Sequence, residues 1–259
     1  MRAAVLLLAL ACGQKTTAPP EEPMPAVEPA PAVEPAPPAA AASDKVGDLT
    51  ITPLYHATLA LEAGGKTWIV DPWTKAPLVD RKADVILITD IHYDHLDQAA
   101  IDKVRKDGTI VVGPAAVAEK TKVDVVIANG ETKEVGGVEV TAVPMYNLTR
   151  GPEPGKLFHD KGRGNGYVLA IAGVRAYIAG DTECTDEMKA LKNIDVAFVP
   201  MNLPYCMPPE EAAVCIKAFA PKVLYPYHYN DADLSGLAAA VGPATEVRLR
   251  EWYPGGLPS

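Results

Sequence analysis

Basic residues, cysteines and long apolar runs are all scarce in this sequence. Its 259 residues include 24 Lys and Arg against 33 Asp and Glu, a formal net charge of −9. A nucleic-acid-binding protein needs a basic face to neutralise phosphates, so this charge balance argues against nucleic acid as a partner. The apolar run over residues 3–11 is too short to span a bilayer as a helix of the mature protein.

Residues 1–12 have the pattern of an export signal. Arg2 supplies a positive start, an apolar stretch follows, and Cys12 comes after a small residue. The sequence Ala9-Leu10-Ala11-Cys12 resembles a bacterial lipobox, in which the cysteine is lipidated, although Ala9 stands where leucine is usual. We therefore expect a signal peptide over residues 1–12 and a protein anchored in the bacterial cell envelope, on its periplasmic or outer face, through Cys12. Simple secretion and a wrongly assigned start are the alternatives.

Residues 13–45 have a composition that cannot build a core. Proline, alanine and glutamate dominate, and the segment 25–31 is nearly repeated at 31–37. Frequent proline favours an extended, polyproline-like chain, and about 28 residues of it could reach on the order of 80 Å. We expect a disordered tether that holds a folded domain, residues 46–259, away from the membrane.

The four cysteines of the chain allow three disulfide pairings. If Cys12 is lipidated, an odd number remains: Cys184, Cys206 and Cys215. Cysteines of this kind are most often packing residues, so we expect these three to pack in the core rather than to bind a metal.

Apolar strands and amphipathic helices alternate along the rest of the chain. A content of 48% hydrophobic and 22% charged residues is that of a soluble globular protein, here with one large domain. Strands are predicted over residues 49–54, 58–70 (as a hairpin), 85–88, 109–112, 123–128, 138–143, 167–171, 174–179, 195–200, 223–225 and 246–249. Helices are predicted over residues 98–106, 114–120, 208–220 and 234–241, the third with Ala213, Val214, Ile216 and Phe219 facing inwards.

Four candidate metal ligands lie within six residues, directly after the apolar run 85–88. They are Asp90, His92, Asp94 and His95. Such a mixture of imidazole and carboxylate suits Zn²⁺, or a harder cation such as Mn²⁺ or Fe²⁺. Residues of these types in a loop can also cap helices or face solvent, and Asp97 is expected to cap the helix that begins at Gln98. The cluster as a whole indicates a metal site.

The same stretch resembles the His-x-His-x-Asp-His signature of the metallo-β-lactamase superfamily, with Asp90 in place of the first histidine. Gly180-Asp181-Thr182 resembles the bridging aspartate of that superfamily, and Pro226-Tyr227-His228-Tyr229 resembles its last histidine motif. Together with the segment 200–205, these motifs look closest to the branch of ascorbate-6-phosphate lactonase-like proteins and N-acyl-phosphatidylethanolamine phospholipase D. The resemblance implies a four-layer αββα sandwich, an α/β fold in which the strands are too numerous for a simple doubly wound sheet.

The resemblance also implies two cation positions. The tighter cation would be bound by Asp94, His95, Asp181 and His228. The other cation would be bound by Asp90, His92 and Asp181, with Asn147 as a further candidate ligand. Asn147 aligns with the third histidine of the superfamily, which makes it a second departure. Because oxygen donors weaken a zinc site, we expect the Asp90 position to fill at higher metal concentration or with Mn²⁺. One or two divalent cations are thus expected, Zn²⁺ first and Mn²⁺ or Fe²⁺ as alternatives.

Several other residues are expected to touch the metal centre or the substrate. His159 could act as a ligand, a proton donor or a substrate contact, and the glycine-rich loop that carries it would suit an anionic group through Lys161 and Arg163, or be a plain surface loop. The remaining candidates, beside the metals or near the pocket, are His56, Asp71, Tyr146, Asn202 and Tyr205.

These residues together predict a metal-dependent hydrolase. A cation makes hydroxide available near neutral pH, Asp94 would orient the water as well as bind metal, and the second cation or His159 would stabilise the developing oxyanion. The expected substrate is a small-molecule or lipid-like ester, lactone or phosphodiester. An iron-dependent redox or sulfur-processing member of the superfamily and a non-enzymatic metal-binding scaffold are the alternatives.

The expected lipid anchor can be tested by fractionation. Replacing Cys12 by Ser removes the only thioether attachment point that the lipobox offers, so Cys12→Ser should move the protein from the detergent phase to the aqueous phase. Phase partitioning of the two forms, expressed in the same bacterial host, measures the shift. Equal partitioning would mean that Cys12 does not carry the anchor.

Overall fold

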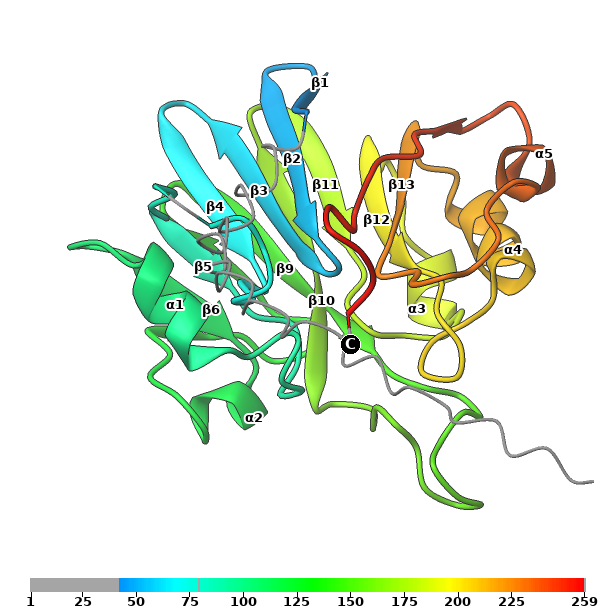
Figure 1. Ribbon diagram of the computed structural model, residues 1–259, viewed down its shortest axis with the longest axis horizontal. Helices are drawn as coiled ribbons and strands as arrows, with labels where there is room; N and C mark the ends of the chain where they lie inside the picture. Colours follow the sequence, from blue (N-terminus) through cyan, green and yellow to red (C-terminus); the bar gives the residue numbers. More distant parts are fainter. Residues whose placement is uncertain (1–41, 79, 259) are drawn as a thin grey trace, which may run out of the picture. The chain divides into compact units, whose positions relative to one another are not determined.

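The computed structural model describes residues 42–78 and 80–258, which form two seven-stranded sheets packed face to face (Figure 1). The expected signal peptide, the lipidated Cys12 and most of the expected tether lie outside the described residues. The end of the tether segment is described, and there Asp44–Val46 forms strand β1, paired with β2. The folded domain therefore begins before residue 46. The boundary was placed too late because this short polar strand has no apolar pattern in the sequence.

The first sheet joins an antiparallel meander to a run of parallel strands. Strands β1 to β4 pair antiparallel in sequence order, and β4 to β7 pair parallel. The strands are β1 (Asp44–Val46), β2 (Leu49–Tyr55), β3 (Thr58–Ala63), β4 (Lys66–Val70), β5 (Val85–Leu87), β6 (Ile110–Gly113) and β7 (Val125–Val126).

The second sheet repeats this arrangement. Strands β8 to β11 pair antiparallel and β11 to β14 pair parallel. The strands are β8 (Thr132–Val135), β9 (Val138–Met145), β10 (Gly164–Ile171), β11 (Val174–Ile178), β12 (Val196–Pro200), β13 (Val223–Tyr227) and β14 (Glu246–Val247). Each sheet thus ends in parallel strands whose carboxyl ends meet at one edge, a place where α/β proteins commonly bind ligands.

Helices cover the outer face of each sheet (Figure 1). Helices α1 (Gln98–Val104) and α2 (Ala115–Ala118) lie outside the first sheet. The second sheet is covered by α3 (Asp186–Lys189), α4 (Pro209–Phe219) and α5 (Leu237–Val241). The predicted αββα sandwich is confirmed.

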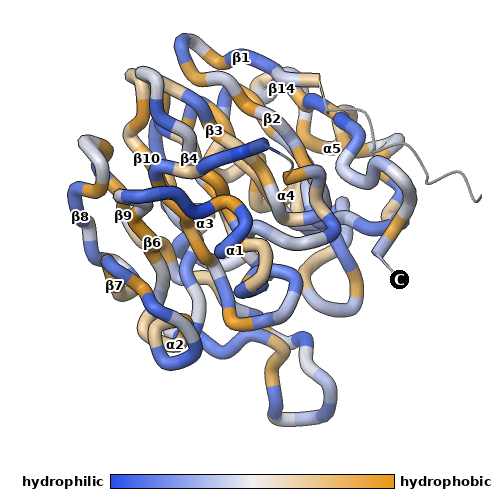
Figure 2. The backbone as a smooth tube through the Cα atoms, turned by 60° about the vertical axis from the view of Figure 1, so that its left-hand side comes forward, coloured by the Kyte–Doolittle hydropathy of each residue, from blue (hydrophilic) through white to orange (hydrophobic). Residues whose placement is uncertain are grey.

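Two apolar cores hold these layers together. The larger contains Trp68, Phe198 and Tyr225, all fully buried, and it extends from the space between the sheets to the residues of α1 and α2 that pack on the first sheet. The smaller lies between the second sheet and its helices, around Met188 and Ile216. Strands buried on both faces read as continuous apolar runs, which is why the central strands were predictable. Figure 2 shows hydrophobic stretches along the strands and hydrophilic ones along the outer loops.

Most predicted elements are present, and the exceptions have physical causes. The strand predicted over residues 123–128 is reduced to Val125–Val126. Strand β8 was missed because its first three residues are exposed and polar, and helix α3 because it has only four residues. Asp97 caps α1 as predicted, since its Oδ1 accepts hydrogen bonds from the backbone of Ala99 and Ala100.

One residue of helix α4 points in the wrong direction for the predicted pattern. Val214 was expected to face inwards with Ala213, Ile216 and Phe219, but its exposed fraction is 59%. The buried face instead includes Cys215, which lies one position further round the helix. The prediction was wrong because it placed Val214 inside on the ground that valine is apolar, whereas position 214 lies on the solvent side of the helix.

The cysteines pack as predicted. Cys184, Cys206 and Cys215 are buried and form no disulfide within the described residues. The Cys215 thiol donates to Met188 Sδ at 3.0 Å, inside the smaller core. Across the same described part of the chain, no helix has the length and apolar character that crossing a membrane requires.

Helix α4 offers a matched test of the burial pattern. Ile216→Ala should cost about 2–5 kcal/mol of unfolding free energy, because it removes a fully buried side chain from the smaller core. Val214→Ala removes an exposed side chain from the opposite side of the same helix and should change stability by less than about 0.5 kcal/mol. Urea unfolding of both variants measures the difference, and equal losses would contradict the assigned helix face.

Candidate metal centre

The candidate site lies where the carboxyl ends of the parallel strands meet. The loop after β5 carries Asp90 to His95, the loop after β11 carries Asp181, and His228 follows β13 directly. The turn between β2 and β3 adds His56, and the loop between β9 and β10 adds His159. All five histidines of the chain are therefore brought to one place from both sheets.

Asp181 stands at the centre of this group. Three imidazole nitrogens face its carboxylate: His95 Nε2 and His159 Nε2 lie 3.4 and 3.2 Å from Oδ2, and His228 Nε2 lies 3.5 Å from Oδ1. The side chain of Asp181 is 4% exposed, so these contacts are almost fully removed from water.

Hydrogen bonds behind two of these rings decide which nitrogen faces the centre. Asp71 Oδ2 lies 2.8 Å from His95 Nδ1, and Asn147 Oδ1 lies 2.7 Å from His159 Nδ1. Both oxygens are acceptors here, since Asp71 Oδ2 also accepts from the Thr89 hydroxyl and Asn147 Oδ1 from the His159 backbone. Each Nδ1 therefore carries a proton, so each ring can offer only its Nε2 to a cation at the centre.

His228 is held from behind by Asn202. The Asn202 Nδ2 atom lies 2.6 Å from His228 Nδ1, whereas Asn202 Oδ1 is buried without a hydrogen-bond partner among the described residues. Amide nitrogen and oxygen are assigned from such networks. With the amide turned so that Oδ1 accepts from Nδ1–H, its oxygen gains a partner and His228 Nε2 also becomes a lone pair directed at the centre.

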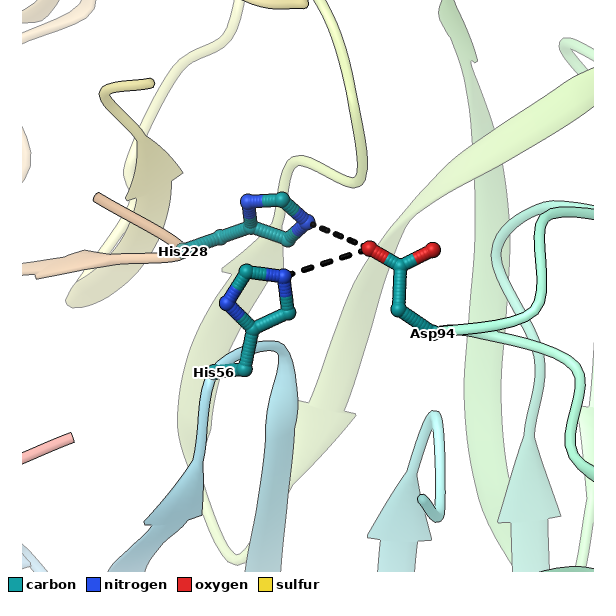
Figure 3. Close-up of side chains that lie close together, drawn as sticks. All are labelled: His56, Asp94 and His228. Carbon is teal, nitrogen blue, oxygen red and sulfur yellow. Dashed lines mark hydrogen bonds and ion pairs between the residues drawn. The ribbon is translucent and has the colours of Figure 1, made fainter. Parts of the chain in front are cut away.

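Asp94 closes the site on the solvent side. Its Oδ2 lies 3.2 Å from His56 Nε2 and 3.3 Å from His228 Nε2, and Figure 3 shows both rings directed at this one oxygen. The two rings lie against each other with centroids 3.7 Å apart. His56 is held from behind by the Tyr253 hydroxyl, 3.2 Å from its Nδ1.

The pKa values reflect this concentration of charge. Burial alone would raise the pKa of the Asp181 carboxyl, but His228 and His95 hold it well below its ordinary value. Burial opposes the charged form of His95, yet Asp181 and Asp94 raise its pKa well above the usual range. Burial, followed by the charge of His228, lowers the pKa of His56 to about 4, which leaves this ring neutral at pH 7. The carboxylates thus favour positive charge in their midst.

Backbone conformation at the site is strained. His56, Asp71 and His228 have φ values of 56°, 42° and 47°, in the left-handed region that side chains rarely occupy. Asp181 is preceded by Gly180, with φ 66°, where an added Cβ would lie 2.5 Å from Met145 Sδ. Strain of this kind persists only where surrounding packing fixes it, which indicates that these residues are held in place for a function.

The donor set fits a divalent cation. Three groups of His and Asp have ligand atoms within 4.8 Å of one another: His95, Asp181 and His228; His56, Asp94 and His228; Asp90, His92 and His159. Among the buried side-chain atoms that lack a partner in the described structure are His95 Nε2, His159 Nε2 and Asp181 Oδ1. Buried polar atoms without partners are costly, and a cation held by His95, Asp181 and His228 would satisfy His95 Nε2 and Asp181 Oδ1.

A pocket of about 350 Å³ opens over these groups. Its polar floor includes Asp94, Asp181 and Asn202. The walls are partly apolar, and they are formed by Tyr93, Phe158, Tyr205 and Pro258. Tyr205 was predicted to lie near the pocket, and in the structure it forms part of the pocket wall.

Two predicted residues have other roles. Asn147 does not direct its oxygen to the centre, because that oxygen accepts from His159 while its Nδ2 donates to Glu183 and to the Tyr205 carbonyl. His159 stands where the superfamily motif led us to expect Asn147. Tyr146, a predicted pocket residue, instead donates to Glu187 and is absent from the pocket wall formed by the described residues.

The basic residues of the glycine-rich loop are also occupied. Lys161 pairs with Glu187, at the surface. Arg163 donates from Nε to Asp90 Oδ1 at 3.0 Å and from its Nη2 to Asp90 Oδ2 at 2.9 Å. Neither lines the pocket, so the predicted anion-binding loop is not formed by these side chains.

Some site residues carried no recognisable signal in the sequence. Tyr253 lies 197 positions from His56, and Asn230 and Pro258 come from the same C-terminal region. Glu183 supports Asn147, and its side chain also pairs with Arg150. Of these, only Glu183 could have been found, since it directly follows the Gly180-Asp181-Thr182 motif.

Comparisons with known proteins agree with this geometry. The sequence profile of the family described as "Beta-lactamase superfamily domain" matches residues 50–228. A UPF0173 metal-dependent hydrolase of Pyrobaculum arsenaticum is 32% identical over 194 residues, which cover 68% of this chain and 81% of that protein. A UPF0173 metal-dependent hydrolase of Geobacillus is 32% identical over 190 residues, covering 68% and 83%.

Solved structures give the same result. The crystal structure of a proposed metal-dependent hydrolase from Parabacteroides distasonis is 39% identical, with a TM-score of 0.77, and the match covers 81% of this chain and 98% of that one. Igni18, a metallo hydrolase from Ignicoccus hospitalis, is 23% identical with a TM-score of 0.65, covering 80% and 96%, and shows the shared fold.

The chain therefore belongs to the metallo-β-lactamase superfamily. Within that superfamily it is a member of the UPF0173 metal-dependent hydrolases, and it is an enzyme. The predicted superfamily and the predicted hydrolase class are confirmed, whereas the lactonase and phospholipase branch stays a prediction.

The hydrogen bond behind His95 can be tested by a single-atom change. Asp71→Asn places an NH₂ group either against His95 Nδ1 or against the Thr89 N–H, so it disturbs the ring that Asp71 orients. We expect zinc affinity to fall about 10–100-fold, the usual cost of losing such a support. Asp84→Asn is the matched control, since Asp84 also accepts a backbone hydrogen bond but lies away from the centre. Titration calorimetry measures both, and unchanged affinity in Asp71→Asn would refute the role.

Proposed function

We propose that this protein hydrolyses an uncharged ester or lactone at a divalent cation, Zn²⁺ before Mn²⁺ or Fe²⁺. The observation that carries the proposal is the convergence of five histidines on Asp90, Asp94 and Asp181 beneath an open pocket. A divalent cation bound there lowers the pKa of a water molecule from about 15.7 towards 7, which supplies a hydroxide nucleophile at neutral pH.

The pocket wall supports a neutral substrate. Among the described residues that line it there is no Lys or Arg, and the two basic side chains of the nearby loop are paired with Asp90 and Glu187. A phosphodiester or a substrate carboxylate would have only the cation as a positive partner here, without the Arg or Lys that commonly helps to bind such a group. The aromatic walls suit an apolar acyl or alcohol group. We therefore favour ester or lactone hydrolysis over the phosphodiester chemistry of the phospholipase side of the predicted branch.

The residues of the pocket have separable roles. His95, His228 and Asp181 would hold the cation, and His159 faces Asp181 from the other side, with its Nε2 3.2 Å from Oδ2. Asp94 faces the pocket beside them and can orient the attacking water. His56 is neutral at pH 7 and lies 3.2 Å from Asp94, so it can hold that carboxylate in position by a hydrogen bond.

The cellular setting of this reaction is proposed from the sequence alone. A lipid on Cys12 and a proline-rich tether would hold the domain at the bacterial cell envelope. A small-molecule or lipid-like ester present there would then be the natural substrate class.

Removing a ligand tests the proposed centre. His95→Ala and His228→Ala each leave Asp181 without one imidazole, so both should lose bound metal and fall to the background rate of hydrolysis. Metal analysis of purified protein and a panel of nitrophenyl esters, lactones and a phosphodiester measure the two effects together. Lys122→Ala, at a surface side chain that is 79% exposed, is the control and should keep wild-type metal content and rate.

The same panel separates the competing functions. We expect wild type reconstituted with Zn²⁺ to hydrolyse esters or lactones faster than the phosphodiester. Activity only with iron and an oxidant would indicate a redox enzyme. Metal binding without turnover on any substrate would indicate a scaffold, and either result would overturn the proposal.

A further inference from the structure

We propose that Arg163 takes the place of the second cation, so that this protein holds one divalent cation where the superfamily motif offers two positions. The inference rests on the proposed metal-dependent function, because it concerns how many cations the same centre binds. It starts from the departure at Asp90, which stands in the first histidine position of the motif.

Both carboxylate oxygens of Asp90 accept hydrogen bonds from Arg163. The guanidinium donates through Nε to Oδ1 at 3.0 Å and through Nη2 to Oδ2 at 2.9 Å, a bidentate pair. The Asp90 side chain is 0% exposed, whereas that of Arg163 is 19% exposed. A bidentate guanidinium takes one lone-pair direction on each carboxylate oxygen, which leaves this carboxylate less able to bind a metal.

His92 also contacts this ion pair through both of its ring nitrogens. Its Nδ1 lies 3.0 Å from Asp90 Oδ2, and its Nε2 lies 3.4 Å from Arg163 Nη2. Both ring nitrogens therefore have partners within the Asp90–Arg163 pair. Of the three residues Asp90, His92 and His159, only His159 keeps an unpartnered nitrogen, and that atom lies closer to Asp181 Oδ2 (3.2 Å) than to Asp90 Oδ2 (4.0 Å).

The charges match a single divalent cation. Arg163 cancels the charge of Asp90, so the carboxylates left facing the centre are Asp94 and Asp181, with two negative charges between them, while Asp71 lies behind His95. One divalent cation balances these two charges. A second cation at Asp90 and His92 would lie next to a guanidinium that is already in contact with both residues, and like charges at such distances repel.

The backbone fixes Arg163 in this position. Arg163 directly precedes β10, and the Asn165 N–H donates to the Thr89 carbonyl at 2.9 Å, one residue before Asp90. At Gly164 an added Cβ would lie 2.9 Å from the same Thr89 carbonyl, so the two segments approach as closely as glycine allows. The start of β10 and the ligand loop are thus locked side by side, with Arg163 opposite Asp90. The backbone of the fold therefore determines the pairing of Arg163 with Asp90.

Zinc stoichiometry provides a direct test. Metal-free full-length protein titrated with Zn²⁺ should bind one ion per chain, counted by calorimetry and native mass spectrometry. Arg163→Gln frees Asp90 and His92, so this variant should gain a second Zn²⁺. The double variant Arg163→Gln/Asp90→Asn should return to one. Arg248→Gln is the matched control, because Arg248 is 18% exposed and paired with Glu246 far from the site, and it should bind one ion.

Each result has a distinct meaning. Two ions in wild type, or one ion in Arg163→Gln, would overturn the role of Arg163 while leaving the metal centre intact. Zero ions in wild type would overturn the proposed metal centre and this inference with it. If Arg163→Gln fails to fold, Asp90→Asn in the wild-type chain decides: unchanged affinity for one ion supports the inference, and a loss of bound zinc shows that Asp90 is a ligand.

Discussion

The hydrogen bonds behind the histidines are the interactions on which the rest of the site depends. An imidazole can bind a cation only through a nitrogen that carries no proton. Asp71 and Asn147 each hold the proton of a ring on its outer nitrogen, and thereby turn the other nitrogen towards Asp181. Without these supports the same five histidines would share protons with the surrounding carboxylates, and the centre would lose its lone pairs.

The fold serves this arrangement by bringing the ends of its parallel strands together. Each sheet delivers its ligands immediately after an apolar strand, where burial on both faces allows little movement. The rigid strand positions the backbone, and the following loop supplies the chemistry. The left-handed conformations of His56, Asp71 and His228 are maintained because the packed strands on either side do not allow them to relax.

Much of this could be predicted from the sequence where the signal is local. The run of residues 90–95, the Gly180-Asp181-Thr182 motif and His228 each follow a strand directly, so their place at the edge of the sheets could be predicted together with the fold. Contacts between distant segments could not be predicted. Whether Asn147 or His159 faces the centre depends on how a loop of twelve residues folds back, and the pairing of Arg163 with Asp90 joins positions 73 residues apart.

The departure at Asp90 illustrates the difference between residue type and environment. As an oxygen donor in a histidine position, it suggested a weak second cation site. In the structure the same carboxylate is neutralised by a guanidinium, and this explains why an acidic residue can be fully buried there. The sequence shows the substitution, and only the packing of β10 against the ligand loop shows its partner.

The central claim is that the lone pairs around Asp181 hold a divalent cation. Anomalous diffraction at the zinc absorption edge, from crystals of the protein grown with Zn²⁺, tests it most directly. The account predicts one strong peak in contact with His95 Nε2, His228 Nε2 and Asp181, and no peak between Asp90 and His92. Absence of a peak at Asp181 would contradict the account.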